Sequence, residues 1–258
     1  MTIVWAIERW GGLVVEGIAS LGDFVLFLFQ AALYLLVPPF KPRLALRQVR
    51  IIGADSLLLI LLIGAFTGMV LGLQGYNTLR RFGSEGALGT VVALVLVREL
   101  GPVLSALMVA ARAGSAMAAE LGAMQATEQI DALAVMAINP VQYLVSPRLL
   151  AGVVSLPLLT SLFDVVGIWG GYLVGVGLMG APGSSYLHGI ASNLRAQDIA
   201  GGVYKALVFG LVVTWVCCYK GFNAARMATG VSRATTEAVV LSSVLILAWD
   251  YLLTSLLL

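Results

Sequence analysis

Five ionisable side chains lie inside long apolar runs of the sequence: Arg98, Glu99, Asp164, Lys205 and Asp250. At the centre of a membrane-spanning helix each charge costs on the order of 2.5 to 3.5 kcal/mol on insertion scales, unless it is paired or reached by water. Lys205 and Asp250 have opposite signs, so we expect an intramembrane ion pair between them, with Asp164 as the other carboxylate available to Lys205. These charges predict a polar site inside an apolar helix bundle.

Arg98 and Glu99 are adjacent, so on a helix their side chains point about 100° apart and cannot pair face to face. Gly101 and Pro102 follow, which loosens the helix and leaves backbone carbonyls in need of donors. The planar guanidinium of Arg98 is suited to holding a phosphate. Two interpretations stay open: the charges line a ligand cavity, or they clamp neighbouring helices together, and both can hold in different states of the protein.

A second candidate site is the segment Ala118 to Pro147, AAELGAMQATEQIDALAVMAINPVQYLVSP, which carries acidic residues between two apolar runs. We predict Thr127 as the N-cap of a short helix, with Glu128 and Asp131 in its first turn, ending before the Asn139-Pro140 pair. A short helix just outside a bilayer suits contact with a soluble partner. The alternative is an amphipathic connector that lies on the lipid headgroups.

Several functions are disfavoured by what the sequence lacks. It contains no G-x-x-x-x-G-K-[ST] phosphate loop, so the chain is not a nucleotide hydrolase, and it has no His, Cys and Asp cluster for a metal. A formal charge of +2 does not indicate nucleic-acid binding. The single histidine, His188, shares a short loop with Ser184, Ser185 and Asp198, and such loops are usually solvated turns rather than catalytic triads.

Long apolar helices are expected to position these residues. Hydrophobic residues make up 60% of the chain and charged residues 11%, and about 20 apolar residues cross ~30 Å of hydrocarbon at 1.5 Å per residue. We predict an all-α integral membrane protein with five spans, the third kinked at Pro157. The spans cover about 51–76, 87–111, 149–179, 199–219 and 235–257.

The first 50 residues are predicted to form a separate part, with residues 51–258 as the transmembrane domain. Arg9, Glu16 and Asp23 recur every seven residues and give residues 1–37 a polar stripe. This stripe favours an interfacial helix, although residues 12–37 are long enough to cross the membrane. The Pro38-Pro39 pair should end that helix. A basic collar then precedes the first span: Lys41, Arg43, Arg47 and Arg50.

The distribution of Lys and Arg predicts the orientation of the spans. With the basic collar on the cytoplasmic side, most of the basic residues outside the spans also lie on that side, as the positive-inside rule requires. The segment Ala118 to Pro147 is then cytoplasmic, within reach of an ATP-consuming partner. The inner set is Lys41, Arg43, Arg47, Arg50, Arg112, Arg148, Lys220, Arg226 and Arg233, and the outer set is Arg80, Arg81 and Arg195.

Glycines repeat every four residues on the first predicted span, at Gly64, Gly68 and Gly72. Such a stripe lets another helix backbone approach closely. Tight packing within the chain is the preferred interpretation, and a seam between two copies is the alternative.

Five motifs carry a resemblance to a known family. They are AxELGxMxxTEQIDALxxMxxNP (residues 118–140), GxxxGMVLGLQGY (64–76), LVRELGPVLSALMVAARAGSA (96–116), GIWGG (167–171) and GVSRATT (230–236). The motifs contain several polar positions that are not interchangeable, and together they cover most of the chain after residue 50. In these motifs the chain resembles the MlaE family, the permease subunits of ABC transporters that work with MCE-domain proteins on phospholipids.

The resemblance implies a multi-pass protein of the bacterial inner membrane that moves phospholipids and maintains outer-membrane lipid asymmetry. It implies a homodimer, ABC ATPase subunits on the cytoplasmic side and a periplasmic MCE-domain hexamer, with ATP and Mg in the ATPase and no cofactor in this chain. The expected ATPase-coupling residues are Glu120, Thr127, Glu128, Gln129, Asp131 and Leu133. The expected lipid-binding residues are Arg98, Glu99, Leu71, Gly75, Leu79, Phe82, Tyr204 and Phe209.

Two rival functions use the same residues without an ATPase. In the first, the five intramembrane charges form an ion or proton relay of a secondary transporter or channel. In the second, the chain is an intramembrane lipid enzyme, but it has no clustered nucleophile, base or metal set. Copurification with an ATPase favours the transporter subunit, and flux driven by voltage or pH through the isolated chain favours the relay.

Overall fold

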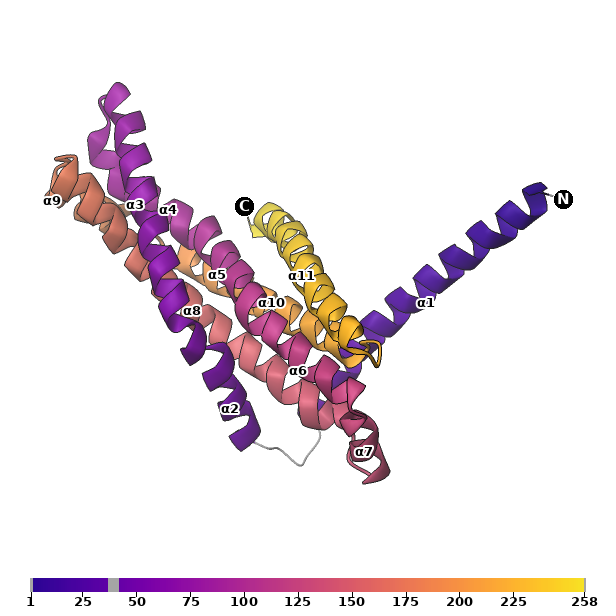
Figure 1. The fold of residues 1–258 in the computed structure, drawn as a ribbon. Helices are drawn as coiled ribbons and strands as arrows, with labels where there is room; N and C mark the ends of the chain where they lie inside the picture. The colour runs from indigo at the N-terminus through magenta and orange to yellow at the C-terminus, as the bar shows by residue number, and fades with distance from the viewer. Residues whose placement is uncertain (1, 37–41, 258) are drawn as a thin grey trace.

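A computed structural model describes residues 2–36 and 42–257, and every regular element in these ranges is helical (Figure 1). The predicted all-α class is therefore confirmed. The main helices are α1 (Thr2–Leu36), α2 (Pro42–Ile52), α3 (Leu57–Arg81), α4 (Leu88–Val95), α5 (Gly101–Val109), α6 (Ser115–Ala126), α7 (Gln129–Val135), α8 (Ser146–Tyr172), α9 (Gly183–Asn193), α10 (Ala196–Phe222) and α11 (Ala228–Leu257).

Six helical stretches within these ranges are long and apolar enough to cross a membrane. Five of them correspond to the predicted spans, starting before each one and ending beyond it or, for the third and fifth, one residue short of it: Pro42–Arg81, Glu85–Ala126, Val141–Leu178, Ala196–Phe222 and Ala228–Leu256. The sixth, Ile18–Leu35, is the second half of α1. An interfacial position for α1 stays a prediction. The side chains of Arg9 and Glu16, and residues 37–41 with the proline pair and Lys41, lie outside what the structure describes.

The second long helix is built from α4, α5 and α6 joined by two π-helical turns, η3 (Leu96–Leu100) and η4 (Ala110–Gly114). Two further π-helical turns flank α8, η5 (Val141–Val145) before it and η6 (Leu173–Leu178) after it. Wide turns of this kind occur mostly as single-turn bulges, often at functional sites. Pro157 lies inside α8, which runs unbroken from Ser146 to Tyr172.

Helices α3 and α8 make the closest contact in the bundle. A Cβ atom added to Gly64 would lie 2.9 Å from the carbonyl oxygen of Phe163, and one added to Gly72 would lie 2.7 Å from that of Gly171. Between these points, a Cβ at Gly68 would overlap the backbone of Gly167. The glycine stripe of α3 therefore packs inside the chain, as the preferred interpretation held.

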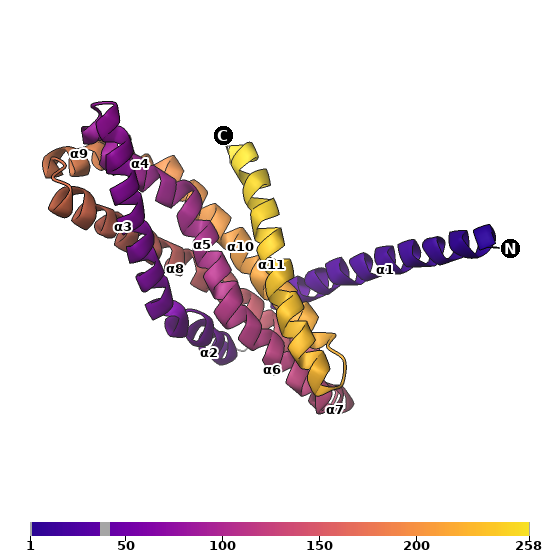
Figure 2. The same ribbon diagram turned by 45° about the horizontal axis from the view of Figure 1, so that its top comes forward.

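The second half of α1 is fastened to the end of the bundle that carries α7, here called the base. Phe24 stacks on Trp215 of α10 with ring centroids 4.0 Å apart, and the Trp215 indole donates to the Phe24 carbonyl at 3.0 Å. The Ser146 hydroxyl donates to the carbonyl of Ala31 at 2.9 Å. From this attachment α1 projects away from the bundle (Figures 1 and 2). Attachment to α8 and α10 thus places α1 beside the candidate segment 118–147.

Helix α11 packs on α10 and α6 near the base and also contacts α5. Its opposite end, with the C-terminus, stands apart from α3 and α9 in both views (Figures 1 and 2). Large apolar side chains on α11 are exposed, among them Val240, Val244, Leu247 and Leu252. In a membrane protein such a surface faces lipid or another apolar helix.

Candidate functional site

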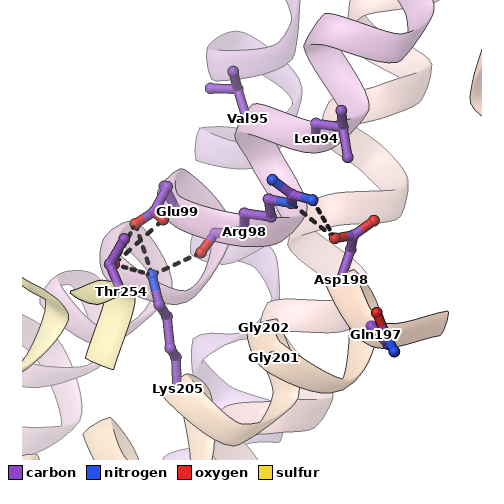
Figure 3. Close-up of a pocket in the computed structure, with 10 residues that line it drawn as sticks. All are labelled: Leu94, Val95, Arg98, Glu99, Gln197, Asp198, Gly201, Gly202, Lys205 and Thr254. Carbon is purple, nitrogen blue, oxygen red and sulfur yellow. Dashed lines mark hydrogen bonds and ion pairs between the residues drawn. The ribbon is translucent and has the colours of Figure 1, made fainter. Parts of the chain in front are cut away.

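A cavity of about 470 Å³ lies between η3, the first turns of α10 and the end of α11 (Figure 3). This volume is in the range of small-molecule sites, roughly 300 to 1,000 Å³. Two apolar side chains and two glycines complete a lining that is otherwise polar. The lining residues are Leu94, Val95, Arg98, Glu99, Gln197, Asp198, Gly201, Gly202, Lys205 and Thr254.

Lys205 is the centre of the polar contacts, and its side chain is only 3% exposed. Its ammonium lies 2.7 Å from Glu99 Oε2 and 3.0 Å from Asp250 Oδ1. It also donates to the hydroxyl of Thr254 at 2.7 Å and to the backbone carbonyl of Arg98 at 2.9 Å. The structure thus brings Lys205 and Asp250 together, as the sequence predicted, and adds Glu99 as a second carboxylate.

The break at Pro102 explains why a backbone carbonyl is available to Lys205. Pro102 has no N–H to donate to Arg98 four residues earlier, and the Gly101 N–H bonds to Leu96, five residues back. The carbonyl of Arg98 therefore needs another donor, and the Lys205 ammonium supplies it. The neighbouring Val97 carbonyl faces Gly202, where any side chain would collide with it.

Arg98 pairs with Asp198, a carboxylate predicted to lie in a solvated loop. Its Nε and Nη2 donate to Asp198 Oδ1 at 2.8 and 2.5 Å. The other oxygen of Asp198 accepts the backbone N–H of Arg195 at 2.9 Å, in a capping box that starts α10. The Asp198 side chain is 7% exposed and the Arg98 side chain 45% exposed. Asp198 therefore fixes the guanidinium while leaving part of it open to the cavity.

Asp198, Gln197 and Thr254 were missed as site residues. Two spacings point to Asp198 and Thr254: Asp198 is seven residues before Lys205, and Thr254 is four residues after Asp250, so each pair shares a helix face. The predicted interpretation of Asp198 as part of a polar loop was therefore wrong.

The other predicted site residues lie away from this cavity. Asp164, on α8, forms no ion pair with any described residue, and its Oδ1 is buried without a hydrogen-bond partner. Phe209 is fully buried in the core, so in this conformation it does not face an open vestibule. Tyr204 is 49% exposed and lies outside the lining. The four residues predicted on α3 and its end are also absent from the cavity lining: Leu71, Gly75, Leu79 and Phe82.

The candidate coupling segment differs from its prediction at its start. Helix α6 continues to Ala126, and Thr127 is its C-cap, not the N-cap of the next helix. Its hydroxyl donates back to the carbonyl of Ala123 at 2.8 Å, a bond within α6 that competes with capping of α7. Glu128, with φ of 58°, makes the turn, and α7 begins at Gln129 and ends at Val135.

The tip around α7 combines apolar and acidic exposure. Val135 is 88% exposed and Met136 is 61% exposed, whereas Ile130 is buried and Leu133 half-buried against the base. Thr127, Glu128, Gln129 and Asp131 are exposed. Arg226, in the connection between α10 and α11, lies 2.7 Å from Asp131 and 3.8 Å from Glu128.

Glu120 and Arg148 join the two ends of this segment. The guanidinium Nη2 of Arg148 lies 2.8 Å from Glu120 Oε2, and Nη1 donates to the carbonyl of Leu144 at 2.9 Å. The Arg148 side chain is 2% exposed and the Glu120 side chain is 57% exposed, so the pair lies at the edge of the base with only the guanidinium buried. The exposed α7 tip thus belongs to a segment whose two ends are joined by an ion pair.

Comparisons with known proteins find that the chain is similar to membrane permeases. The profile of a protein family, Permease MlaE, matches residues 45–256. A probable ABC transporter permease protein of Rickettsia typhi is 44% identical over 92% of this chain and 92% of its own length. The intermembrane phospholipid transport system permease protein MlaE of Haemophilus influenzae is 43% identical over 94% and 98%. The chloroplastic protein TRIGALACTOSYLDIACYLGLYCEROL 1 of Arabidopsis thaliana is 36% identical over 95% and 68%.

Proposed function

The chain belongs to the MlaE family of permeases, and on that premise we propose that it is the membrane subunit of an ATP-driven transporter of phospholipids. It has no nucleotide-binding motif of its own, so ATP and Mg bind in a separate ATPase subunit. Family membership supports the remaining parts of the proposal: a bacterial inner-membrane homodimer, ATPase subunits against α7, and a periplasmic MCE-domain hexamer at the other face.

The observation that carries this proposal is a charged cavity between apolar helices. A phospholipid has one polar end and two chains without hydrogen-bonding groups, so a matching site needs a few polar contacts beside an extensive apolar surface. The cavity supplies the first through Arg98 and Glu99. Leu94 and Val95 in the lining, with the exposed apolar side chains of α11, supply the second.

Helix α11 provides a connection between the cavity and the base. It starts just after the loop that carries Arg226, which contacts α7, and near its end Asp250 and Thr254 contact Lys205. Movement of α7 by an ATPase would therefore reach the cavity through α11. Such movement changes lipid affinity only if the ATP-bound and ATP-free partner contact α7 differently.

The test of this proposal is a substitution at the exposed tip, with the complex reconstituted in lipid. Val135→Asp places a charge on a surface side chain that makes no core contact, so the permease should insert normally while phospholipid-stimulated ATP turnover falls. Val135→Leu, which keeps an apolar side chain at the same exposed position, is the matched control and should leave turnover unchanged. Unchanged coupled transport in Val135→Asp would reject the assignment of α7.

A secondary transporter driven by the intramembrane charges is not favoured. Four of the charges meet around Lys205 and η3, but among the described residues no hydrogen bond or ion pair joins Asp164 to them. The matched relatives are also named as ABC or phospholipid transport permeases.

A further inference from the structure

The polar groups of the cavity are unequally available to a ligand. Lys205 is saturated: an ammonium has three hydrogens, and four oxygen acceptors lie within 3.0 Å of Nζ. Its side chain is also 3% exposed. A phosphate entering the cavity therefore has no hydrogen to accept from Lys205.

Arg98 keeps donors that a phosphate can use. A guanidinium has five N–H groups, and only Nε and Nη2 are directed at Asp198. The remaining nitrogen points away from Asp198 (Figure 3), and the side chain is 45% exposed. Because every phospholipid carries a phosphate, this contact binds the whole class without distinguishing its members.

Glu99 keeps acceptor capacity on the other side of the same helical turn. Its Oε2 accepts from Lys205, whereas the described donor nearest to Oε1 is the Thr254 hydroxyl at 3.3 Å, and a carboxylate has about four acceptor positions. The side chain is 40% exposed. A ligand cation that donates hydrogen bonds is the natural partner of this carboxylate.

We infer that the cavity selects phospholipids whose headgroup carries a primary ammonium, with Arg98 on the phosphate and Glu99 on the ammonium as the specificity-determining residue. This inference rests on the proposed function and adds the substrate class to it. An anionic glycerol headgroup brings the same phosphate but no cation for Glu99. A quaternary ammonium has no N–H to donate and is usually bound by aromatic rings, and none of the described lining residues is aromatic.

The experiment is competitive retention of lipids by the purified full-length chain, read by native mass spectrometry. The probe is an equimolar mixture of phosphatidylethanolamine, phosphatidylglycerol and phosphatidylcholine with identical acyl chains. The parent should retain the ethanolamine lipid about three- to tenfold over each of the others, as expected for one charge-assisted hydrogen bond in a half-exposed site.

Two variants separate the roles of the two charges. Glu99→Gln should bring the three lipids to equal retention, and Glu99→Asp should restore the preference. Arg98→Gln should lower retention of all three by similar factors. Asp250→Asn is the matched control for Glu99→Gln, because it removes the other carboxylate on Lys205 without removing a group that lines the cavity. Whatever total amount of lipid Asp250→Asn retains, the ratio among its three retained lipids should equal that of the parent.

The outcomes distinguish this inference from the proposed function. Retention of phospholipid with no preference, or a preference that survives in Glu99→Gln, overturns the inference and leaves phospholipid transport standing. Loss of the preference in Asp250→Asn as well would assign selectivity to the net charge of the cluster and would also overturn it. If the parent retains no phospholipid, both the inference and the proposed function fail.

Discussion

The two sides of the helix bundle are held by different forces. On one side, α3 and α8 meet through glycines whose backbones are in contact, so the fit depends on shape. On the other side, the end of α11 is tied by Asp250 and Thr254 to charged groups around Lys205. A close-packed seam has one good arrangement, whereas a polar contact can exchange its partner for a ligand. Under the proposed function, a response to lipid is therefore expected on the α11 side of the bundle.

The largest effect should come from removing the cation of the polar cluster. Lys205→Met leaves the carboxylates of Glu99 and Asp250 uncompensated. Breaking a fully buried ion pair from one side costs about 3–5 kcal/mol, and because these carboxylates are 40% and 21% exposed the loss should lie at or below the lower end of that range. The measurement is thermal unfolding in detergent, with Lys220→Met as control, because the Lys220 side chain is 28% exposed. Equal losses in the two variants would show that burial does not set the strength of this cluster.

The glycine seam should respond strongly to a single methyl group. In Gly68→Ala the new Cβ overlaps the backbone of Gly167, and overpacking of this kind costs about 1–3 kcal/mol. Gly177→Ala is the matched control, since nothing lies within 4 Å of the added atom. Thermal unfolding and the yield of monodisperse protein measure both. If Gly68→Ala were as stable as Gly177→Ala, the contrast between a rigid and a responsive side would be lost.

A smaller effect is expected from Thr254→Val. The substitution keeps the shape but removes the hydroxyl shared by Lys205 and Glu99, which should cost about 1 kcal/mol. It should also loosen the end of α11, seen as faster amide hydrogen exchange in residues 250–257 but not near the base. Thr236→Val, which removes a hydroxyl bonded only within α11, serves as control. Equal exchange in the two variants would contradict the role of this contact.

The smallest effect on stability should come from Arg226→Ala. Arg226 pairs with Asp131 and Glu128, but all three side chains are at least 50% exposed, and exposed pairs contribute about 0–1 kcal/mol. The unfolding midpoint should therefore stay close to that of the parent. A loss as large as that of Lys205→Met would mean that the α7 tip depends on this contact for its position.

Apolar length and charge sign allowed much of the fold, and the pairing of Lys205 with Asp250, to be predicted from the sequence. Both depend on properties that hold along a helix: hydrophobic length, and the cost of an uncompensated charge. The cost of placing a charge in an apolar helix also indicated Arg98 and Glu99 as candidate site residues.

The remaining site residues depended on tertiary position. Asp198 looked like part of a polar loop because only the folded chain shows that the start of α10 lies beside η3. Phe209 looked available because its burial comes from neighbouring helices. The start of α7 was misjudged because the hydroxyl of Thr127 can cap a following helix or bond back to a preceding one.

The ion pair between Glu120 and Arg148 determines how stiff the protruding tip is. Because it joins α6 to the start of α8 at the edge of the base, the chain between them has both ends anchored at one level. A load applied to α7 is then shared by two long helices in parallel, instead of bending a single flexible connection. A force that a partner protein applies to α7 would therefore move α6 and α8 together, with little bending of the segment between them.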